Sequence, residues 1–319
     1  MKEPNLEVNI AGIKMKNPVM AASGTFGYGT EYPEISKYKL NELGAIVLKS
    51  VTLNPRPGNS PIRIAETSAG MLNSIGLQNI GVKALIKEKL PELKSVGTNI
   101  IINIAGSTID EYVETAKILG QAREEIAALE INISCPNVKK GGLAFGTDPE
   151  VIRELIGRVK EAADALAVIA KLTPNVTDVT AIARAAAEAG ADAVSLINTV
   201  LGMAIDIQTK RPVLESNVGG LSGPAIKPIA LRMIHQVSQA FKIEGIKIPI
   251  IGLGGIWDAE DALSLIIAGA NAVQIGTANF YDPFVCHKVI SGIKEFLIKE
   301  RCSDINCLVG SLKPHSYGD

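Results

Sequence analysis

The sequence predicts a parallel (β/α)8 barrel, also called a TIM barrel, built as a single domain over residues 1–319. The main observation is eight short apolar runs that alternate with helical patterns, as in a barrel of parallel strands buried on both faces. The second is composition: 47% of the residues are hydrophobic but only 4% are aromatic, so the core is mainly aliphatic. An open doubly wound sheet is the alternative. It usually needs fewer strands, and no GxGxxG motif follows the first run.

The expected elements follow one another along the chain in strand–helix order. The expected strands are 17–23, 44–50, 99–107, 128–134, 167–173, 192–199, 248–255 and 271–277. The expected helices are 108–121, 148–166, 177–192, 224–241 and 258–270. Asp148 has the position of an N-cap, with Pro149 as the first helical residue. The pair Thr177-Asp178 begins the next helix and Gly190 ends it.

Four segments do not belong to the eight strand–helix units of a minimal barrel. The stretch "LEVNIAGIKMKN" (6–17) predicts an N-terminal β-hairpin across the barrel floor. Long insertions are expected after the second strand (51–81), the fourth strand (135–146) and the sixth strand (201–223). Because long loops in compact domains are usually functional, we expect these insertions to bind or enclose a ligand.

Charge and composition exclude several classes of protein. The net charge is −1 and no basic stripe is present, which disfavours nucleic-acid binding. No apolar stretch reaches the roughly 18 residues of a membrane helix, and the start "MKEPNLEVNI" lacks a signal-peptide core. The four cysteines, Cys135, Cys286, Cys302 and Cys307, form no CxxC pair, so we expect reduced thiols in a cytoplasmic protein.

Polar residues follow nearly every expected strand. Barrel enzymes have their active site at the carboxyl ends of the strands, so these residues are expected to form one rim. They are Ser23, Gly24, Lys49, Ser50, Asn103, Asn132, Ser134, Cys135, Asn137, Lys171, Asn198, Thr199, Gly254, Gly255, Gly276 and Thr277. Each one alone is compatible with a solvated or internally hydrogen-bonded residue. Together they predict a ligand site, since buried polar groups need partners.

The rim residues also indicate the chemistry of the ligand. The glycine-containing ends of strands seven and eight are where barrels usually bind phosphate, because glycine lets an anion approach backbone N–H groups. Lys171 lies deeper, where a cation would stabilise the negative charge of a reduced flavin. No metal is expected, because His235, His287 and His315 have no ligand spacing.

Cys135 directly follows the fourth strand, in "LEINISCPNVKKGG" (129–142). Such a cysteine can be a small buried residue, half of a disulfide, a metal ligand or a catalytic group. Its placement among polar rim residues favours the catalytic interpretation, and a thiol with an ordinary pKa near 8.5 is a usable base. The residues alone leave the buried, purely structural alternative open.

Several long motifs resemble those of the dihydroorotate dehydrogenase family. They are "ASGTFGYG", "KSVTLNPRPGN", "AETSAGMLNSIGLQN", "EINISCPN", "GGLAFGTDPE", "INTVLGM", "GGLSGPAIKP" and "GTANFYDPF". The similarity extends from about Leu6 to about Leu297 and is greatest to the NAD-linked class 1B catalytic subunit. It implies an FMN-binding barrel, with one FMN per chain, that oxidises (S)-dihydroorotate to orotate in pyrimidine biosynthesis.

The resemblance also implies roles for individual residues. Cys135 would be the catalytic base that removes the C5 proton, while the C6 hydride passes to FMN. The implied FMN contacts are Ser23, Lys49, Ser50, Asn103, Asn132, Lys171, Ile197, Gly223, Gly254, Gly255, Gly276 and Thr277. The implied substrate contacts are Lys49, Asn73, Ser74, Ile75, Gly76, Leu77, Asn132, Asn137, Asn198 and Thr199. The asparagines suit a ligand with alternating amide donors and acceptors.

The resemblance further implies a heterotetramer in which two copies of this chain join two electron-transfer subunits carrying FAD and a [2Fe–2S] cluster. No cluster is expected on this chain, because Cys302 and Cys307 have no further cysteine partners. We give these two residues and the C-terminal tail no role. The alternatives are a fumarate-linked class 1A enzyme, the flavin barrel of dihydropyrimidine dehydrogenase, which occurs in much longer chains, and a non-catalytic flavin-binding barrel.

Overall fold

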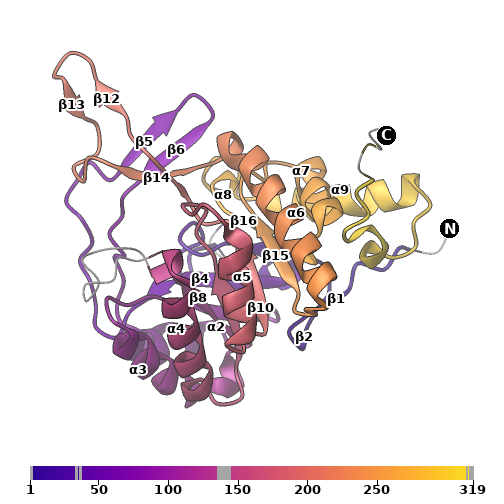
Figure 1. Cartoon of the computed structure of the whole chain (residues 1–319), viewed down its shortest axis with the longest axis horizontal. Coiled ribbons are helices and arrows are strands. Elements are labelled where there is room, and N and C mark those ends of the chain that lie inside the picture. Colours follow the sequence, from indigo (N-terminus) through magenta and orange to yellow (C-terminus); the bar gives the residue numbers. More distant parts are fainter. Residues whose placement is uncertain (1–2, 33–34, 36–37, 135–144, 314, 316–319) are drawn as a thin grey trace.

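The computed structural model describes residues 3–32, 35, 38–134, 145–313 and 315. Eight parallel strands close into a barrel, which confirms the predicted fold class (Figure 1). In chain order the strands are β3 (Val19–Ala21), β4 (Ala45–Val51), β7 (Asn99–Ile104), β8 (Ala128–Asn132), β9 (Ala167–Lys171), β10 (Ala193–Leu196), β15 (Ile250–Leu253) and β16 (Ala272–Ile275). Strand β16 pairs with β3, and this pairing closes the barrel.

Helices cover the outside of the barrel, and successive helices pack against one another (Figure 1). The long ones are α3 (Ile109–Gly120), α4 (Pro149–Ala162), α5 (Val179–Glu188), α6 (Lys227–Glu244), α7 (Ala259–Ala268) and α9 (Val285–Lys299). The short ones are α1 (Val82–Ala84), α2 (Leu90–Leu93) and α8 (Ala278–Tyr281). Asp148 is the N-cap of α4, as the sequence predicted, and Asp178 of the predicted Thr/Asp start is the N-cap of α5. No helix in the described part of the chain is long and apolar enough to span a membrane.

The core is aliphatic, as the composition predicted. Every residue of β3 and β10 is buried, and Ile46, Leu48 and Ile101 are fully enclosed. Valine, isoleucine and leucine suit these positions because each strand packs on helices outside and on side chains inside the barrel. The barrel interior also contains buried polar residues, among them Glu130 and Gln274. Gln274 lines the functional site described next, and Glu130 lies beneath it.

The N-terminal hairpin lies at the floor of the barrel, as predicted. Strands β1 (Val8–Ile10) and β2 (Ile13–Met15) pair antiparallel, and their alternate residues are buried. The Asn99 side chain, at the start of β7, donates a hydrogen bond of 3.0 Å to the Lys14 carbonyl. The hairpin therefore covers the amino ends of the barrel strands, at the opposite end from the predicted site.

The insertions after the second and sixth barrel strands meet in one antiparallel sheet, which we call the roof sheet. Its strand order is β11 (Val200–Gly202), β14 (Gly219–Ser222), β6 (Gly70–Asn73) and β5 (Ile64–Thr67). The close pairing of β6 and β14 requires glycine, since a Cβ on Gly70 would lie 1.9 Å from the Ser222 carbonyl oxygen. The sequence predicted the two insertions but not their pairing.

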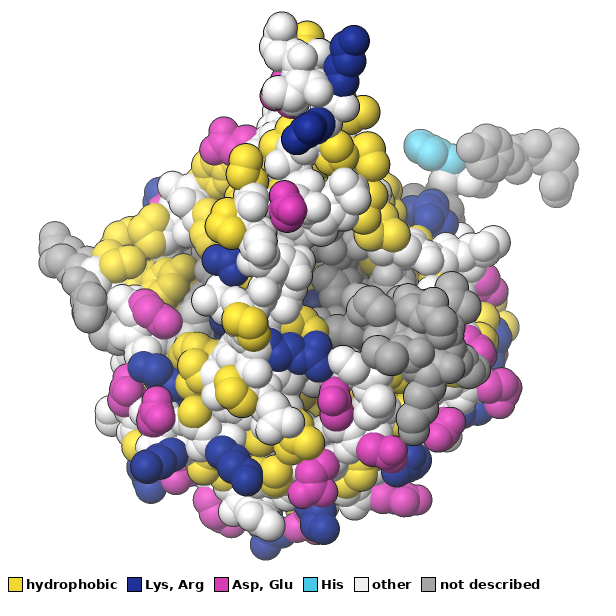
Figure 2. Space-filling model, turned by 90° about the vertical axis from the view of Figure 1, so that its left-hand side faces the viewer, with side chains coloured by type: hydrophobic (Ala, Val, Ile, Leu, Met, Phe, Trp, Pro, Cys, Tyr) yellow, Lys and Arg dark blue, Asp and Glu magenta, His cyan; other side chains and the backbone are white. Residues whose placement is uncertain are grey.

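A two-stranded hairpin extends beyond the roof sheet as an arm (Figure 1). It consists of β12 (Ile205–Asp206) and β13 (Arg211–Pro212). Hydrophobic side chains gather on the arm and at its base (Figure 2). Ile207 is 78% exposed, and Leu201, Met203 and Ile205 are also exposed. Most of the predicted insertion after the fourth strand lies outside the described residues.

Candidate active site

A cavity of about 760 Å³ lies at the carboxyl ends of the barrel strands. Its walls come from the strand ends, from the segment that follows β6, and from the roof sheet. This volume is in the range of small-molecule and cofactor sites. The cavity is therefore large enough for a cofactor and a small substrate side by side.

Most of the predicted site residues line this one cavity. From the predicted FMN contacts these are Ser23, Lys49, Ser50, Asn132, Lys171, Ile197, Gly223, Gly254, Gly255, Gly276 and Thr277. From the predicted substrate contacts they also include Asn73, Ser74, Ile75, Gly76, Leu77, Asn198 and Thr199. Asn103 does not line the cavity; it is 1% exposed and lies one layer below. Cys135 and Asn137 lie outside the described residues.

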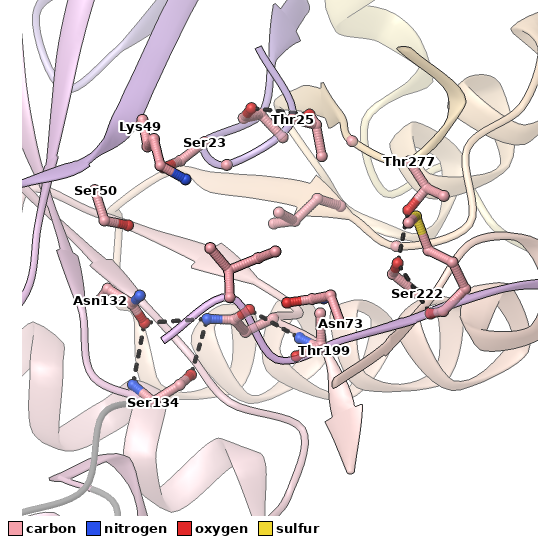
Figure 3. Close-up of a pocket in the computed structure, with 18 of the residues that line it drawn as sticks. Ser23, Thr25, Lys49, Ser50, Asn73, Asn132, Ser134, Thr199, Ser222 and Thr277 are labelled. Carbon is pink, nitrogen blue, oxygen red and sulfur yellow. Dashed lines mark hydrogen bonds between the residues drawn. The ribbon is translucent and has the colours of Figure 1, made fainter. Parts of the chain in front are cut away.

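Amide side chains form one wall of the cavity (Figure 3). The Asn198 Nδ2 atom donates to Asn132 Oδ1 at 3.1 Å and to Ser134 Oγ at 2.9 Å, and Asn198 Oδ1 accepts from the Thr199 backbone N–H. Beside Thr199 (Figure 3), Asn73 Nδ2 donates to the Gly220 carbonyl. No described residue accepts a hydrogen bond from Asn132 Nδ2, so this group remains a free donor at the cavity wall.

Lys49 places a cation in the cavity, and no described residue supplies an anion to balance it. Within the described part of the chain, no hydrogen bond or ion pair involves its Nζ atom. Burial lowers the pKa of Lys49, and the positive charge of Arg63 lowers it further. A buried cation is stable when an anion pairs with it. The site is therefore suited to a ligand with a negative charge next to Lys49.

A buried network lies directly below the cavity and is centred on Glu130, which is 0% exposed. Its Oε1 atom accepts from Asn103 Nδ2 and lies next to Lys171 Nζ, both at 3.2 Å. Its Oε2 atom accepts from Gln274 Nε2 at 3.1 Å. We did not predict Glu130 or Gln274 as site residues. The available signal was a charged residue inside the apolar run of β8, where such residues are almost never buried without a partner.

Glycines form the end of the cavity at β15 and β16. Gly254 and Gly255 have φ values of 127° and 76°, and a Cβ on Gly255 would lie 2.5 Å from Lys227 Cβ. At Gly276 a Cβ would instead have ordinary contacts of 3.8 Å, with Ala22 and Thr25. The missing side chain of Gly276 leaves room in the cavity itself, as the approach of an anion to backbone N–H groups requires.

Three buried polar atoms of the cavity have no hydrogen-bond partner among the described residues: Ser23 Oγ, Ser74 Oγ and Gln274 Oε1. Buried polar atoms are nearly always hydrogen-bonded, and each unsatisfied one costs about 1–3 kcal/mol. Ser23 follows β3, Ser74 follows β6 and Gln274 lies on β16. The residues present therefore fit a polar ligand that fills the cavity, such as a flavin nucleotide with a substrate beside it.

Asn79 anchors the segment 73–77 that lines the cavity. Its Oδ1 atom accepts from the backbone N–H groups of Thr52 and Gly81, at 3.1 and 2.8 Å. Its Nδ2 atom donates to Thr52 Oγ1 at 2.9 Å and to the Leu77 carbonyl at 2.7 Å. One buried amide thus ties the end of the insertion back to the end of β4.

We expect Asn79→Ala to lower the free energy of unfolding by about 2 kcal/mol or more. The substitution leaves two buried N–H groups without acceptors, at roughly 1–3 kcal/mol each. Urea denaturation measures this loss, with Gln236→Ala on the exposed face of α6 as the control, expected to change stability by less than about 0.5 kcal/mol. A loss no larger than that of the control would show that Asn79 does not anchor the segment.

Other chemistries have little support in the described part of the chain. No group of three or more His, Cys, Asp or Glu residues there could hold a metal ion. Cys286 is fully buried, and burial raises the pKa of its thiol to about 12, so it is not a usable base or nucleophile. Cys302 and Cys307 are not paired in a disulfide.

The closed barrel and the polar, cation-bearing cavity at the carboxyl ends of its strands define a (β/α)8-barrel enzyme. The comparison with known families specifies it: the chain belongs to the dihydroorotate dehydrogenase family, whose profile matches residues 5–297. It is therefore an oxidoreductase of a flavin-dependent family.

Curated relatives are similar over almost the whole chain. A protein of Geotalea daltonii is 53% identical over 313 residues, which cover 98% of this chain and 100% of the relative. A protein of Thermoanaerobacter pseudethanolicus is 53% identical over 309 residues, or 97% and 99% of the two chains. One of Geobacter sulfurreducens is 50% identical over 313 residues, or 98% and 100%. Each is named dihydroorotate dehydrogenase B (NAD(+)), catalytic subunit.

Proposed function

We propose that this chain is the catalytic subunit of an NAD-linked dihydroorotate dehydrogenase, which oxidises (S)-dihydroorotate to orotate with FMN as its cofactor. The observation that carries the proposal is one cavity that brings together the asparagines, the glycine turns and Lys49, which no described residue pairs with. The family membership and the printed names of the relatives support the same reaction.

The proposed FMN site uses two ends of the cavity. Gly223, Gly254, Gly255, Gly276 and Thr277 would surround the phosphate, with backbone N–H groups as donors. Ser23, Lys49, Ser50, Asn132, Lys171 and Ile197 would contact the ring system. Asn103 would act on the ring from below, through Ser50, since Ser50 Oγ donates to Asn103 Oδ1 at 2.6 Å. Bound FMN would supply the hydride acceptor.

The proposed substrate site is the asparagine wall together with residues 73–77. Lys49 would pair with the carboxylate of dihydroorotate. Among the described residues, Asn132 Nδ2 and Ser74 Oγ have no hydrogen-bond partner, so both could bind the polar groups of the substrate ring. Asn137, Asn198 and Thr199 would complete the contacts with the dihydropyrimidine ring. A ring with alternating N–H and C=O groups matches amide side chains, because each amide offers a donor and an acceptor.

In the proposed chemistry Cys135 removes the C5 proton of the substrate as the C6 hydride leaves. The thiolate form of Cys135 takes the proton, and the two electrons leave with the hydride. Lys49 and the asparagines hold the substrate in position for both transfers. Ser134 hydrogen-bonds to Asn198, so the residue before Cys135 is tied to the asparagine wall. That connection is expected to direct the thiol towards the substrate.

The electrons are proposed to leave this chain through a separate subunit that carries FAD and a [2Fe–2S] cluster and reduces NAD+. The words "catalytic subunit" in the relatives' names support such a partner for those proteins. We propose two copies of this chain and two partner subunits in the complex, which mass measurement of the co-expressed proteins would test. A cytoplasmic location is part of this proposal.

The proposed function is tested by assaying the purified chain with dihydroorotate and an artificial electron acceptor. We expect bound FMN, orotate formation, and NAD+ reduction only after the partner subunit is added. Fumarate reduction by the isolated chain would instead indicate the class 1A activity. FMN binding without any turnover would indicate a non-catalytic flavin-binding barrel.

Gly276→Ala tests the phosphate end of the site separately. The added methyl group is 3.8 Å from its nearest neighbours, so we expect an unchanged melting temperature. We expect FMN affinity to fall about tenfold or more, because a charge-assisted hydrogen bond to phosphate is worth about 1.5–3 kcal/mol. Fluorescence titration of apoprotein with FMN measures this.

Gly157→Ala is the matched control for Gly276→Ala, because it adds the same methyl group on α4, outside the residues that line the cavity. We expect wild-type FMN affinity for this control. Wild-type affinity in Gly276→Ala as well would place the phosphate elsewhere.

A further inference from the structure

Glu130 determines the hydrogen-bonding direction of the groups around it. An ionised carboxylate can only accept hydrogen bonds. The amide NH2 groups of Asn103 and Gln274 must therefore face Glu130, as they do at 3.2 and 3.1 Å. As a result the Gln274 carbonyl oxygen has no described partner, and that residue lines the cavity. Asn103 Oδ1 therefore accepts a hydrogen bond from Ser50 Oγ. Because the Ser50 hydroxyl uses its proton in this bond, its oxygen can only accept a hydrogen bond from a ligand in the cavity.

Glu130 also holds Lys171 at the cavity floor. The Lys171 Nζ atom lies 3.2 Å from Glu130 Oε1, and the Lys171 side chain is 6% exposed. The two residues lie on neighbouring strands, β8 and β9, and no other acid pairs with Lys171 among the described residues. The carboxylate and the ammonium group therefore form one buried, neutral pair, with the cation at the cavity and the anion beneath it.

We infer that Glu130 is a positioning residue that holds Lys171 and partly cancels its charge, and that it thereby sets the relative affinity for oxidised and reduced flavin. This inference rests on the proposed function, in which the FMN ring lies against Lys171. A cation near the ring stabilises the negative charge of the reduced form. Because electrostatic interactions are strong in a buried site, a carboxylate 3.2 Å from that cation weakens the effect.

Glu130→Gln is the direct test, since glutamine has the same shape and no charge. We expect the ratio of affinities for reduced and oxidised FMN to rise at least tenfold, because the ammonium group of Lys171 is no longer compensated. Redox titration of the FMN-loaded protein measures this as a rise in midpoint potential of about 30 mV per tenfold change. Glu130→Asp keeps the charge. We therefore expect its ratio of affinities for reduced and oxidised FMN to be much closer to the wild-type value than that of Glu130→Gln.

The matched control is Asp261→Asn. Asp261 is also buried and paired with a lysine, Lys227, but it lies on α7 and does not line the cavity. Its Oδ2 atom accepts from the Trp257 backbone N–H at 2.8 Å. We expect this control to change stability but to keep the ratio of the two affinities within twofold of wild type. An unchanged or lowered ratio in Glu130→Gln would overturn the inference.

A second comparison applies if Glu130→Gln does not fold. Lys171→Met removes the cation through which Glu130 is inferred to act. Adding Glu130→Gln to Lys171→Met should therefore change the ratio no more than twofold. A tenfold difference would mean that Glu130 acts without Lys171, which contradicts the inference.

The failure of the inference is distinguishable from the failure of the proposed function. Wild-type protein that binds no FMN would overturn the proposed function, and the inference with it. Wild-type FMN binding combined with an unaltered ratio in Glu130→Gln would overturn the inference alone.

Discussion

Cys135→Ser is expected to lower the rate of dihydroorotate oxidation by roughly 10²- to 10⁴-fold at neutral pH, the usual contribution of a general base. A serine hydroxyl ionises far less readily than a thiol. At neutral pH serine therefore stays protonated and cannot accept the C5 proton. FMN binding should be unchanged, because the sequence does not predict Cys135 as a cofactor contact. Steady-state assays with an artificial acceptor measure the rate.

The pH dependence gives Cys135→Ser a second readout. Wild-type activity should rise with pH as the thiol ionises, around its ordinary pKa of about 8.5. Serine should remove this rise between pH 6 and 9. Cys307→Ser is the matched control, because Cys307 is an exposed free thiol, and it should retain wild-type activity. Wild-type rates for Cys135→Ser across this pH range would show that Cys135 is not the base.

Lys49→Met is expected to raise the KM for dihydroorotate about 30-fold or more. Removing one partner of a buried, hydrogen-bonded charge pair costs about 2–5 kcal/mol, and each 1.4 kcal/mol is a factor of ten. The substrate carboxylate would then enter the cavity without a cation. Binding of orotate, measured by titration, should weaken by a similar factor. Lys94→Met on the surface is the control, since the Lys94 side chain is 71% exposed.

The lowered pKa of Lys49 also predicts how binding depends on pH. Burial disfavours the charged form, so the free protein loses this proton at a lower pH than an ordinary lysine does. Below that pKa the cation is present and binds the carboxylate; as the pH rises through it, the affinity should fall. Lys49→Met should bind weakly at every pH and show no such fall. A KM that is unaffected by the substitution would place the carboxylate elsewhere.

The barrel was predictable because its signals are local. The apolar runs, the Asp148 and Asp178 caps and the N-terminal hairpin each depend on residues close together in the chain. The rim was predictable for a related reason, since the carboxyl ends of successive parallel strands meet at one end of a barrel. This explains why residues as distant as Ser23 and Thr277 were correctly expected at one cavity.

The parts that the sequence did not predict depend on contacts across the barrel. We predicted Glu130 only as part of an apolar strand. Its hydrogen bond from Gln274 joins residues 144 positions apart in the chain. Side chains that meet inside a barrel depend on the stagger between strands, which no local pattern encodes. Asn103 was expected among the cofactor contacts, but its side chain is directed at Glu130 and Ser50. The roles proposed for Cys135 and Asn137 remain predictions.

The roof sheet cannot be completed during translation until strand β14 has been synthesised. Strand β6 finds its neighbour only when β14 has been synthesised, and the hydrogen bond from Asn73 to Gly220 joins positions 147 apart. Until then the ribosome-bound chain exposes the edge of the β5–β6 hairpin, and such an edge can pair with other chains. We therefore expect nascent chains that stop before residue 219 to need chaperones, and the ligand-binding cavity to form late in biosynthesis.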